Sequence, residues 1–391
     1  ISHLPGKGEC EKMKFLFASD SFKGSLSSVK TGILLEKAAK EIFPSCICES
    51  VSVADGGEGT LDAIIKTVKG ELIPVEVHDP LMRKKTAYYG KMDESRAIVE
   101  MALASGYTLV PEQEKNPLYT TSYGTGELIK DALDKGFRQI HIAIGGSATN
   151  DGGMGCMRAL GIRFLDSAGK ELDGTGAELE RVARIDCSGL DPRIRQTKFT
   201  VMCDVTNPLC GKNGATYTFG KQKGGTPEIL CRMENGMCNY REVIKKELGI
   251  NADEITGAGA AGGLGAALMV FLNAKMRSGI ETVLDLINFE KYLEGVSLVV
   301  TGEGRTDWQS CYGKVMQGVG ECCRKHEIPV VGLVGSMGKG AEDIYNHGVE
   351  SLMTTVNAVM CLDDALDNAE KLYYEGALRM FRLIRTGMKM R

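Results

Sequence analysis

The chain has 391 residues, a length that exceeds what one hydrophobic core usually supports, so we expect two domains. Its 43% hydrophobic and 25% charged residues are typical of a globular protein, and its 49 glycines predict many loops that approach ligands. The formal net charge of −4 argues against nucleic-acid binding through a broad basic surface, and no apolar run is long enough to span a membrane.

The amino-terminal segment predicts the start of a parallel sheet. Residues 1–12 show no apolar periodicity and are interpreted as a tag or disordered leader. Residues 14–19 form a nearly continuous apolar run, which is typical of a strand buried on both faces. The polar segment 20–25 (DSFKGS) follows, and Ser27 then caps a helix that runs to Phe43.

The next segments predict a second strand and then a change of pattern. A strand at residues 48–53 leads through residues 54–60 (ADGGEGT) into a helix from about Thr60. Alternating apolar and polar residues then predict an antiparallel meander, with strands at residues 71–78, 86–91 and 96–101. A second domain is therefore expected to interrupt the first.

Within this insertion, glycine-rich loops follow predicted elements. A helix at residues 126–136 precedes a strand at 139–144, which leads into residues 145–153 (GGSATNDGG). This loop is either a tight strand-to-helix turn or a site where backbone N–H groups bind an oxyanion. Similar glycine-rich loops at residues 54–60, 257–265 (GAGAAGGLG) and 301–307 (TGEGRTD) favour the second interpretation.

The carboxyl-terminal part returns to the first pattern. Short apolar strands at residues 297–301, 330–334 and 351–355 are separated by helices at 314–326 and 341–347. The fold class is therefore α/β, with a doubly wound parallel sheet of Rossmann-like type and an inserted mixed α/β domain. We expect the first domain at 13–71 plus 286–385, the inserted domain at 72–285, and the active site in the cleft between them.

Acidic residues stand in or beside the small-residue loops, namely Asp20, Asp55, Glu58, Asp151, Asp204, Glu303 and Asp307. Each alone is typical of a turn or helix cap. Together they match what phosphoryl transfer requires, because carboxylates hold Mg²⁺ and one of them can accept the proton of the substrate hydroxyl. Lys23 is the best candidate cation, and Arg305 is a second.

Two other classes of function stay open at this point. Residues 257–262 match the spacing of a dinucleotide-binding fingerprint, which would indicate an NAD-dependent hydroxy-acid dehydrogenase, but no buried strand precedes them. A non-catalytic binder of small acids would share the two-domain cleft without needing these carboxylates.

The thirteen cysteines show neither a disulfide pattern nor the spacing of a zinc ribbon, so we expect reduced thiols in a cytoplasmic protein and no structural zinc.

Taken in order, six motifs resemble the type I glycerate kinase family: residues 20–25, 54–60, 145–153, 203–209 (CDVTNPL), 257–265 and 301–307. The resemblance extends from Met13 to about Leu383. It implies transfer of the γ-phosphoryl group of ATP to D-glycerate with Mg²⁺, usually on the 2-hydroxyl, with 3-phosphoglycerate as the alternative product. Ser19, Thr306 and Trp308 depart from the family pattern without replacing an acid or Lys23.

The resemblance also yields the candidate site. The expected catalytic residues are Lys23, Asp55, Asp204 and Asp307, and the three aspartates are also the candidate metal ligands. Substrate or phosphate is expected at Ser21, Gly56, Gly57, Glu58, Gly145, Gly146, Ser147, Thr149, Asn150, Asp151, Asn207, Gly302, Glu303 and Arg305. The expected partners are ATP and D-glycerate, with no nucleic acid or membrane, and the protein is expected to be a monomer or homodimer.

Overall fold

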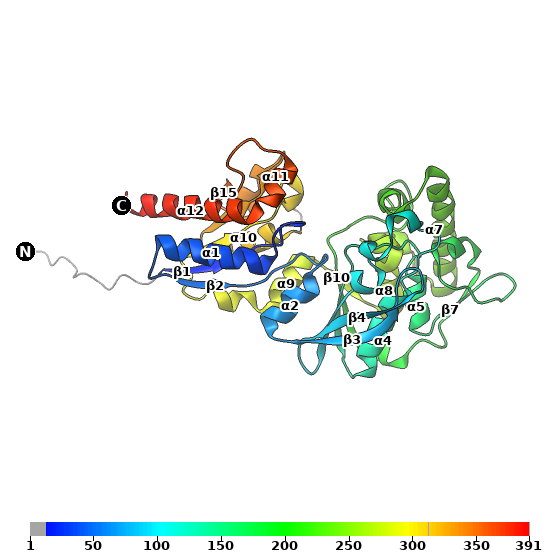
Figure 1. The fold of residues 1–391 in the computed structure, drawn as a ribbon. Coiled ribbons are helices and arrows are strands. Elements are labelled where there is room, and N and C mark those ends of the chain that lie inside the picture. The colour runs from blue at the N-terminus through cyan, green and yellow to red at the C-terminus, as the bar shows by residue number, and fades with distance from the viewer. Residues whose placement is uncertain (1–12, 312, 391) are drawn as a thin grey trace, which may run out of the picture. The chain divides into compact units, whose positions relative to one another are not determined.

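The computed structural model describes residues 13–390 except residue 312, and the predicted leader lies outside this range. It divides into two compact units (Figure 1). The first unit comprises the chain up to Asp55 and from Val283 onward, and the second comprises Gly56–Thr282. The first division falls earlier than the predicted boundary at residues 71 and 72, so helix α2 (Thr60–Val68) belongs to the second unit.

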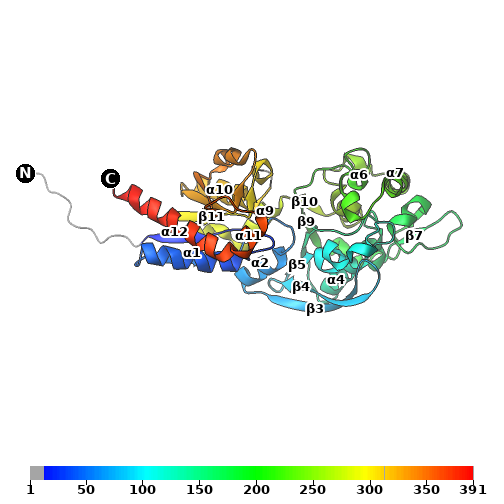
Figure 2. The same ribbon diagram turned by 45° about the horizontal axis from the view of Figure 1, so that its top comes forward.

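A parallel five-stranded sheet forms the centre of the first unit, in the order β15-β13-β11-β1-β2 (Figure 2). Its strands are β1 (Lys14–Phe17), β2 (Ile47–Ser50), β11 (Leu298–Thr301), β13 (Val330–Val334) and β15 (Ser351–Thr354). All neighbouring pairs run parallel, so the predicted doubly wound sheet is confirmed. A short pair, β12 (Arg305–Thr306) and β14 (Ser336–Met337), lies beyond the strand ends.

Helices flank this sheet. They are α1 (Ser28–Ile42), α10 (Val315–Lys325), α11 (Leu362–Asp367) and α12 (Ala369–Met388), together with the 3₁₀ segments η8 (Phe289–Leu293), η9 (Trp308–Cys311) and η10 (Ala341–His347). Ser27 caps α1 as predicted, since its hydroxyl accepts a bond from the Lys30 N–H at 3.2 Å. The chain returns from the second unit within α9 (Gly279–Ile287).

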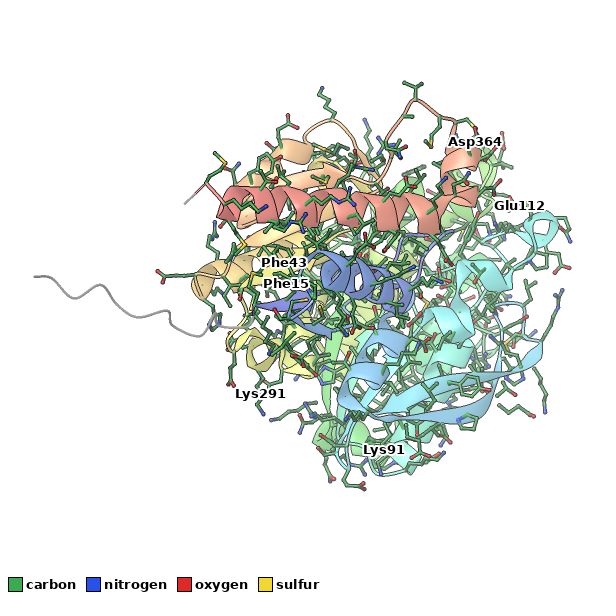
Figure 3. The ribbon with its side chains drawn as sticks, turned by 60° about the vertical axis from the view of Figure 1, so that its left-hand side comes forward. Phe15, Phe43, Lys91, Glu112, Lys291 and Asp364 are labelled. Atoms are coloured by element: carbon green, nitrogen blue, oxygen red, sulfur yellow. The ribbon has the colours of Figure 1, made fainter. Side chains whose placement is uncertain are left out.

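Aromatic side chains fill the core between this sheet and the packed pair α1 and α12. The rings of Phe15 and Phe43 (Figure 3) are 5.5 Å apart in an edge-to-face arrangement. The ring of Phe381 of α12 lies 5.4 Å from that of Phe15. On α10, Met316 lies against Gly332 of β13. The alternation of strands and helices along the sequence therefore produces a covered parallel sheet.

The second unit contains a mixed six-stranded sheet in the order β10-β9-β6-β5-β4-β3. Its strands are β3 (Glu71–His78), β4 (Lys84–Lys91), β5 (Arg96–Glu100), β6 (Gln139–Ala143), β9 (Lys198–Met202) and β10 (Lys275–Arg277). The predicted antiparallel meander is present as β3, β4 and β5, whereas the pairs β5–β6, β6–β9 and β9–β10 are parallel. A separate antiparallel two-stranded sheet pairs β7 (Arg163–Leu165) with β8 (Arg184–Asp186).

Helices build the rest of this unit around one large apolar core. They are α3 (Ala102–Ser105), α4 (Tyr123–Asp134), α5 (Met154–Ala159), α6 (Ala215–Phe219), α7 (Pro227–Leu248) and α8 (Leu264–Leu272). The 3₁₀ segments are η1 (Tyr107–Leu109), η2 (Glu112–Glu114), η3 (Gly176–Arg181), η4 (Pro192–Gln196), η5 (Lys221–Lys223), η6 (Ala252–Glu254) and η7 (Ala260–Gly263). In the described part of the chain, no helix has both the length and the apolar character needed to cross a membrane.

Packing explains why α2 belongs to the second unit. Leu61 and Ile65 of α2 lie so close to Gly90 of β4 that a β-carbon there would come within 2.4 Å of the Ile65 side chain. The Glu100 carboxylate, at the end of β5, accepts bonds from the N–H groups of Gly59 and Leu61 at 3.0 and 2.9 Å. A buried acid and a glycine therefore fix the first turn of α2 on this sheet.

Candidate functional site

A pocket of about 480 Å³ lies in the first unit, at the carboxyl ends of its parallel strands. The strand order reverses between β1 and β11, and such a switch point is where doubly wound sheets bind ligands. The loops after β1, β11, β13 and β15 all contribute to the lining. Its charged and hydroxyl side chains are Asp20, Ser21, Lys23, Ser25, Asp55, Glu303, Arg305, Lys314, Ser336, Thr355 and Tyr373.

Three carboxyl groups line this pocket, and the most perturbed is Asp20. Burial raises the pKa of Asp20 to about 7, and the charges of Asp55 and Glu303 add to this increase. The Ser21 N–H, which donates to Asp20 Oδ1 at 2.6 Å, and the charge of Lys23 oppose it. A carboxyl group that titrates near neutral pH can act as a general base.

Neighbouring side chains fix the position of the Glu303 carboxylate. Its Oε1 accepts hydrogen bonds from the hydroxyls of Ser310 and Thr306, and its Oε2 lies 3.7 Å from Lys314 Nζ. Burial raises the pKa of Glu303, whereas the Ser310 bond and the charge of Lys314 lower it. The carboxylate therefore has a fixed orientation beside a cation.

Three cations line the same pocket, namely Lys23, Arg305 and Lys314. Lys23 and Arg305 are exposed and Lys314 is half-buried. Arg305 also pairs with Asp307, with 3.5 Å between Nε and Oδ2. Asp307 itself is not part of the pocket lining.

The second unit has its own pocket of about 460 Å³, also at the carboxyl ends of parallel strands. Residues after β5, β6 and β9 form much of it. The lining comprises Glu58, Ala102, Tyr107, Thr108, Ile144, Gly145, Gly146, Ser147, Cys203, Val205, Phe219, Gln222, Lys223, Ala260 and Ala261. The glycine-rich loop after β6 therefore borders a cavity, as the sequence predicted for a ligand-binding loop.

Lys223 is the one fully buried lysine of this lining. Its ammonium donates hydrogen bonds to Ser147 Oγ at 2.8 Å and to the carbonyl oxygen of Thr149 at 2.6 Å. Burial lowers the pKa of Lys223 to about 7, and the charge of Asp151 opposes this decrease. The lysine ties η5 to the 145–153 loop and places a cation beside the pocket.

Close backbone approach explains the glycines at the start of the 145–153 loop. A β-carbon on Gly145 would lie 2.7 Å from the Cα of Gly57, which is closer than real β-carbons come to any neighbour. Gly146 has a φ of +76°, a conformation that glycine adopts without strain. The predicted residues Gly56 and Gly57 therefore contact this loop, although they are absent from the pocket lining.

Two loops expected to bind phosphate have their helical N–H groups occupied by carboxylates of the protein. Glu100 accepts the bonds at the start of α2. The fully buried Asp151 accepts bonds from the N–H groups of Gly153 and Gly155 at the start of α5, and from the N–H and hydroxyl of Ser122. Asp151 therefore stabilises the loop from inside and does not line the pocket.

Replacing Asp151 with alanine is expected to lower the free energy of unfolding by roughly 3–5 kcal/mol, because four buried donors lose their acceptor. Asp93→Ala is the matched control, since Asp93 also accepts four bonds but its side chain is 41% exposed. Urea denaturation should show a loss at least twice as large for Asp151→Ala. Equal losses would contradict the structural role of Asp151.

The other predicted residues make hydrogen bonds within the protein, and most of these bonds join segments that are distant in the sequence. The Asp204 carboxylate accepts bonds from the Gly279 N–H at 3.1 and 3.3 Å, at the start of α9. Asn207 Nδ2 donates to the Asn213 carbonyl, and buried Asn150 donates to Thr216 Oγ1. The carbonyl oxygen of Gly302 accepts a bond from the Asp20 N–H at 2.9 Å, so it supports the first pocket without lining it.

The dinucleotide-binding interpretation of residues 257–262 gains no support from the structure. The segment η6 (Ala252–Glu254) precedes them where the fingerprint requires a strand. Close packing explains the glycines instead, because a β-carbon on Gly259 or Gly262 would meet the carbonyl oxygens of Pro208 and Thr149.

Lys314 and Lys223 were not selected from the sequence, and Asp20 was named there only among the acids beside the loops, not as a catalytic or metal-binding residue. Asp20 follows a predicted buried strand, and this position was the signal that could have selected it. Nothing in the sequence indicated that Lys223 is buried, because a lysine in a polar segment is usually solvated. Only the packing of η5 shows that it is buried.

The chain is similar to known proteins both in sequence and in structure. The sequence model described as the Glycerate kinase family matches residues 15–385. The glycerate 2-kinase of Escherichia coli (strain K12) is 45% identical over 91% of this chain and 94% of its own length. The glycerate kinase of Bacillus subtilis (strain 168) is 43% identical over 94% of this chain and 96% of its own length. A crystal structure from Salmonella typhimurium LT2, assigned as glycerate kinase 2, aligns with a TM-score of 0.85 and 41% identity over 97% of this chain and 100% of that one.

Proposed function

Because this chain belongs to the glycerate kinase family, we propose that it transfers the γ-phosphoryl group of ATP to the 2-hydroxyl of D-glycerate, giving 2-phosphoglycerate and ADP. The observation that carries this proposal is the pocket of the first unit, where three carboxyl groups meet three cations at the switch point of a parallel sheet. Phosphoryl transfer needs these groups, since catalysis depends on positioning and on neutralising negative charge.

In this proposal Asp20 is the general base that accepts the proton of the attacking hydroxyl. Its carboxyl lines the pocket and titrates near neutral pH, as a base in the physiological range must. Lys23 and Arg305 offer positive charge to the transferring phosphoryl group, and Lys314 orients Glu303.

The residues present fit Mg²⁺, which prefers carboxylate oxygen ligands. Asp55 and Glu303 are the proposed ligands in the first pocket. When bound, the ion would neutralise charge on the phosphate oxygens. Asp204 and Asp307 stay candidates of the sequence analysis and do not line this pocket.

The pocket of the second unit is proposed to hold an anionic group of a substrate, either phosphate or the glycerate carboxylate. Residues Gly145–Ser147 and buried Lys223 line it together. Backbone N–H groups of such a loop and a neighbouring ammonium are suitable donors for an oxyanion.

We expect Mg²⁺-dependent ADP release with D-glycerate, and none with L-glycerate or without an acceptor. Phosphorus NMR of the product should show 2-phosphoglycerate, the product that the name of the Escherichia coli relative supports. 3-Phosphoglycerate would retain the kinase and correct the acceptor hydroxyl. NAD reduction by glycerate without ADP release would replace the kinase with a dehydrogenase.

A further inference from the structure

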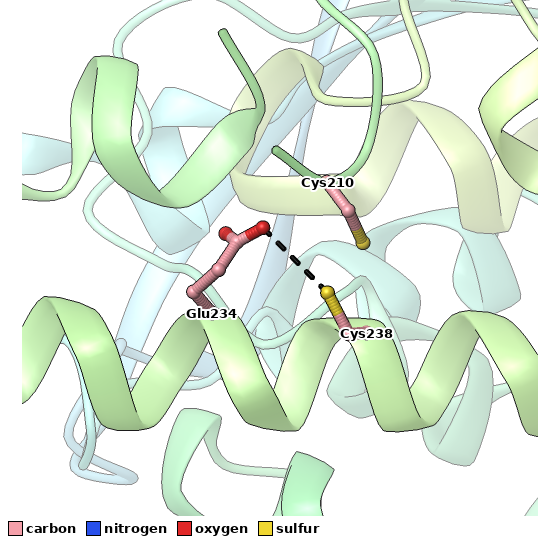
Figure 4. Close-up of side chains that lie close together, drawn as sticks. All are labelled: Cys210, Glu234 and Cys238. Atoms are coloured by element: carbon pink, nitrogen blue, oxygen red, sulfur yellow. Dashed lines mark hydrogen bonds between the residues drawn. The ribbon is translucent and has the colours of Figure 1, made fainter. Parts of the chain in front are cut away.

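A second cluster of metal-ligating side chains lies in the second unit, outside the pocket already described. It consists of Cys210, Glu234 and Cys238 (Figure 4). Glu234 and Cys238 stand four residues apart on α7, so both project from one face of this helix. Cys210 lies in the segment between β9 and α6 and completes the cluster from the opposite side.

The cluster has the dimensions of a small coordination site. The two thiol sulfurs and a carboxylate oxygen all lie within 4.8 Å of one another, and Cys238 Sγ is 3.7 Å from Glu234 Oε1. In tetrahedral zinc sites, Zn–S bonds of about 2.3 Å and Zn–O bonds of about 2.0–2.2 Å place neighbouring ligand atoms roughly 3.5–3.8 Å apart. Only a small inward movement of the side chains is needed to reach these separations.

The Glu234 carboxylate is buried and only partly hydrogen-bonded. The Gly211 N–H donates to Glu234 Oε1 at 2.5 Å, but Oε2 is buried and has no hydrogen-bond partner among the described residues. Glu234 is only 8% exposed. A buried carboxylate that lacks donors is costly, and a cation bound to Oε1, the oxygen that faces the sulfurs, would compensate its charge.

We propose that Cys210, Glu234 and Cys238 bind one thiophilic divalent cation, with Zn²⁺ as the best match. Two thiols and one carboxylate are ligands that zinc accepts, and a water molecule would occupy the fourth position. On binding, each thiol loses its proton to solvent and its sulfur forms a bond to the ion, so no oxidant or reductant takes part. The ion would link α7 to the segment that begins with Cys203 and Asp204.

A disulfide between the two cysteines is the competing chemistry. The two sulfurs lie within 4.8 Å of each other, so an oxidant could join them in place of a metal ion. The sequence predicted no zinc site because these ligands are not closely spaced. The fold alone brings Cys210 to the helix that carries Glu234 and Cys238.

The test titrates Co²⁺ into the reduced, metal-depleted full-length protein under anaerobic conditions. We expect one equivalent to bind, with the thiolate-to-cobalt charge-transfer band and the visible bands of tetrahedral Co²⁺, and Zn²⁺ should displace it. Cys238→Ser should lose the charge-transfer intensity of one thiolate and weaken binding at least about tenfold, as should Glu234→Gln, which nearly preserves side-chain shape. Circular dichroism verifies that each variant folds.

The matched control is Cys231→Ser, because Cys231 is an exposed cysteine on the same helix. Cys48→Ser controls for the sulfur pair Cys46 and Cys48, which lie 3.5 Å apart. Both controls should keep the band and the affinity. The proposal is overturned if Co²⁺ does not bind, if Cys238→Ser and Glu234→Gln bind as tightly as the parent protein, or if mass spectrometry of the metal-free protein in air finds a Cys210–Cys238 disulfide that replaces metal binding.

Discussion

Replacing Asp20 with asparagine should lower kcat for D-glycerate phosphorylation by roughly 10²–10⁴-fold, because the amide cannot accept the hydroxyl proton. The substitution preserves the size of the side chain and its acceptor oxygen for the Ser21 N–H, so the loop after β1 should keep its conformation. Steady-state kinetics with saturating ATP and Mg²⁺ measure the effect. KM should change much less than kcat if the carboxylate acts mainly in the transition state.

The pH dependence of kcat/KM and of stability provides a second measurement of the role of Asp20. Since the pKa of Asp20 is about 7, kcat/KM of the parent enzyme should rise as pH increases through 7 and then level off. Stability should change in the opposite direction. The folded protein keeps the Asp20 proton up to about pH 7, whereas an unfolded chain loses it near its ordinary pKa of 3.8, so this group's stabilising contribution is lost as pH rises between these values.

Asp20→Asn should therefore lack that pH-dependent loss of stability and should denature at higher urea concentration than the parent above pH 7. Asp343→Asn is the control, because Asp343 is exposed on η10 of the same unit and should change neither property. An Asp20→Asn enzyme with kcat within tenfold of the parent would exclude Asp20 as the base and direct attention to Asp55.

The sequence predicted the strands of the first unit's parallel sheet and β3, β4, β5 and β6 of the second unit, but not β7, β8, β9 or β10. The strands that were predicted share a physical signal. Each buried strand of the first sheet is a short apolar run between polar segments, and β3, β4 and β5 alternate apolar and polar residues. The first unit boundary was harder to place. Whether α2 packs on one sheet or the other depends on Gly90 and Glu100, which lie 25 or more residues along the chain from the residues they contact.

Some of the residues predicted for the site line one pocket and others do not, and their placement has a physical explanation. Lys23, Asp55, Glu303 and Arg305 do line one pocket, because they follow parallel strands whose carboxyl ends meet. Asp151 was expected to face a ligand, but a glycine-rich loop looks the same in sequence whether its N–H groups bind phosphate or a buried carboxylate of the protein. Only the packing of Asp151 against Ser122 distinguishes these cases.

Lys223 carries the second large prediction, since its ammonium supports the loop that borders the pocket of the second unit. Lys223→Met preserves most of the aliphatic volume and removes the charge. We expect kcat/KM to fall by roughly a hundredfold or more, because the Ser147 hydroxyl and the Thr149 carbonyl lose their donor and the pocket loses its buried cation. Lys221→Met, on the exposed side of η5, is the matched control and should leave kcat/KM unchanged.

A stability measurement separates this role of Lys223 from a general packing defect. The pKa of the buried ammonium is about 7, whereas an unfolded chain holds that proton up to about 10.5. Between these values the unfolded state binds more protons, so this group makes the parent protein more stable as pH rises. Lys223→Met should lack that increase. The unfolding free energy of the parent should therefore rise relative to that of the variant from about pH 7 to about pH 10.5. A constant difference across this range would show that Lys223 keeps its proton in the folded protein. Lys223 would then be a cation over this whole range, and a loss of kcat/KM in Lys223→Met would be assigned to the lost charge and its two hydrogen bonds.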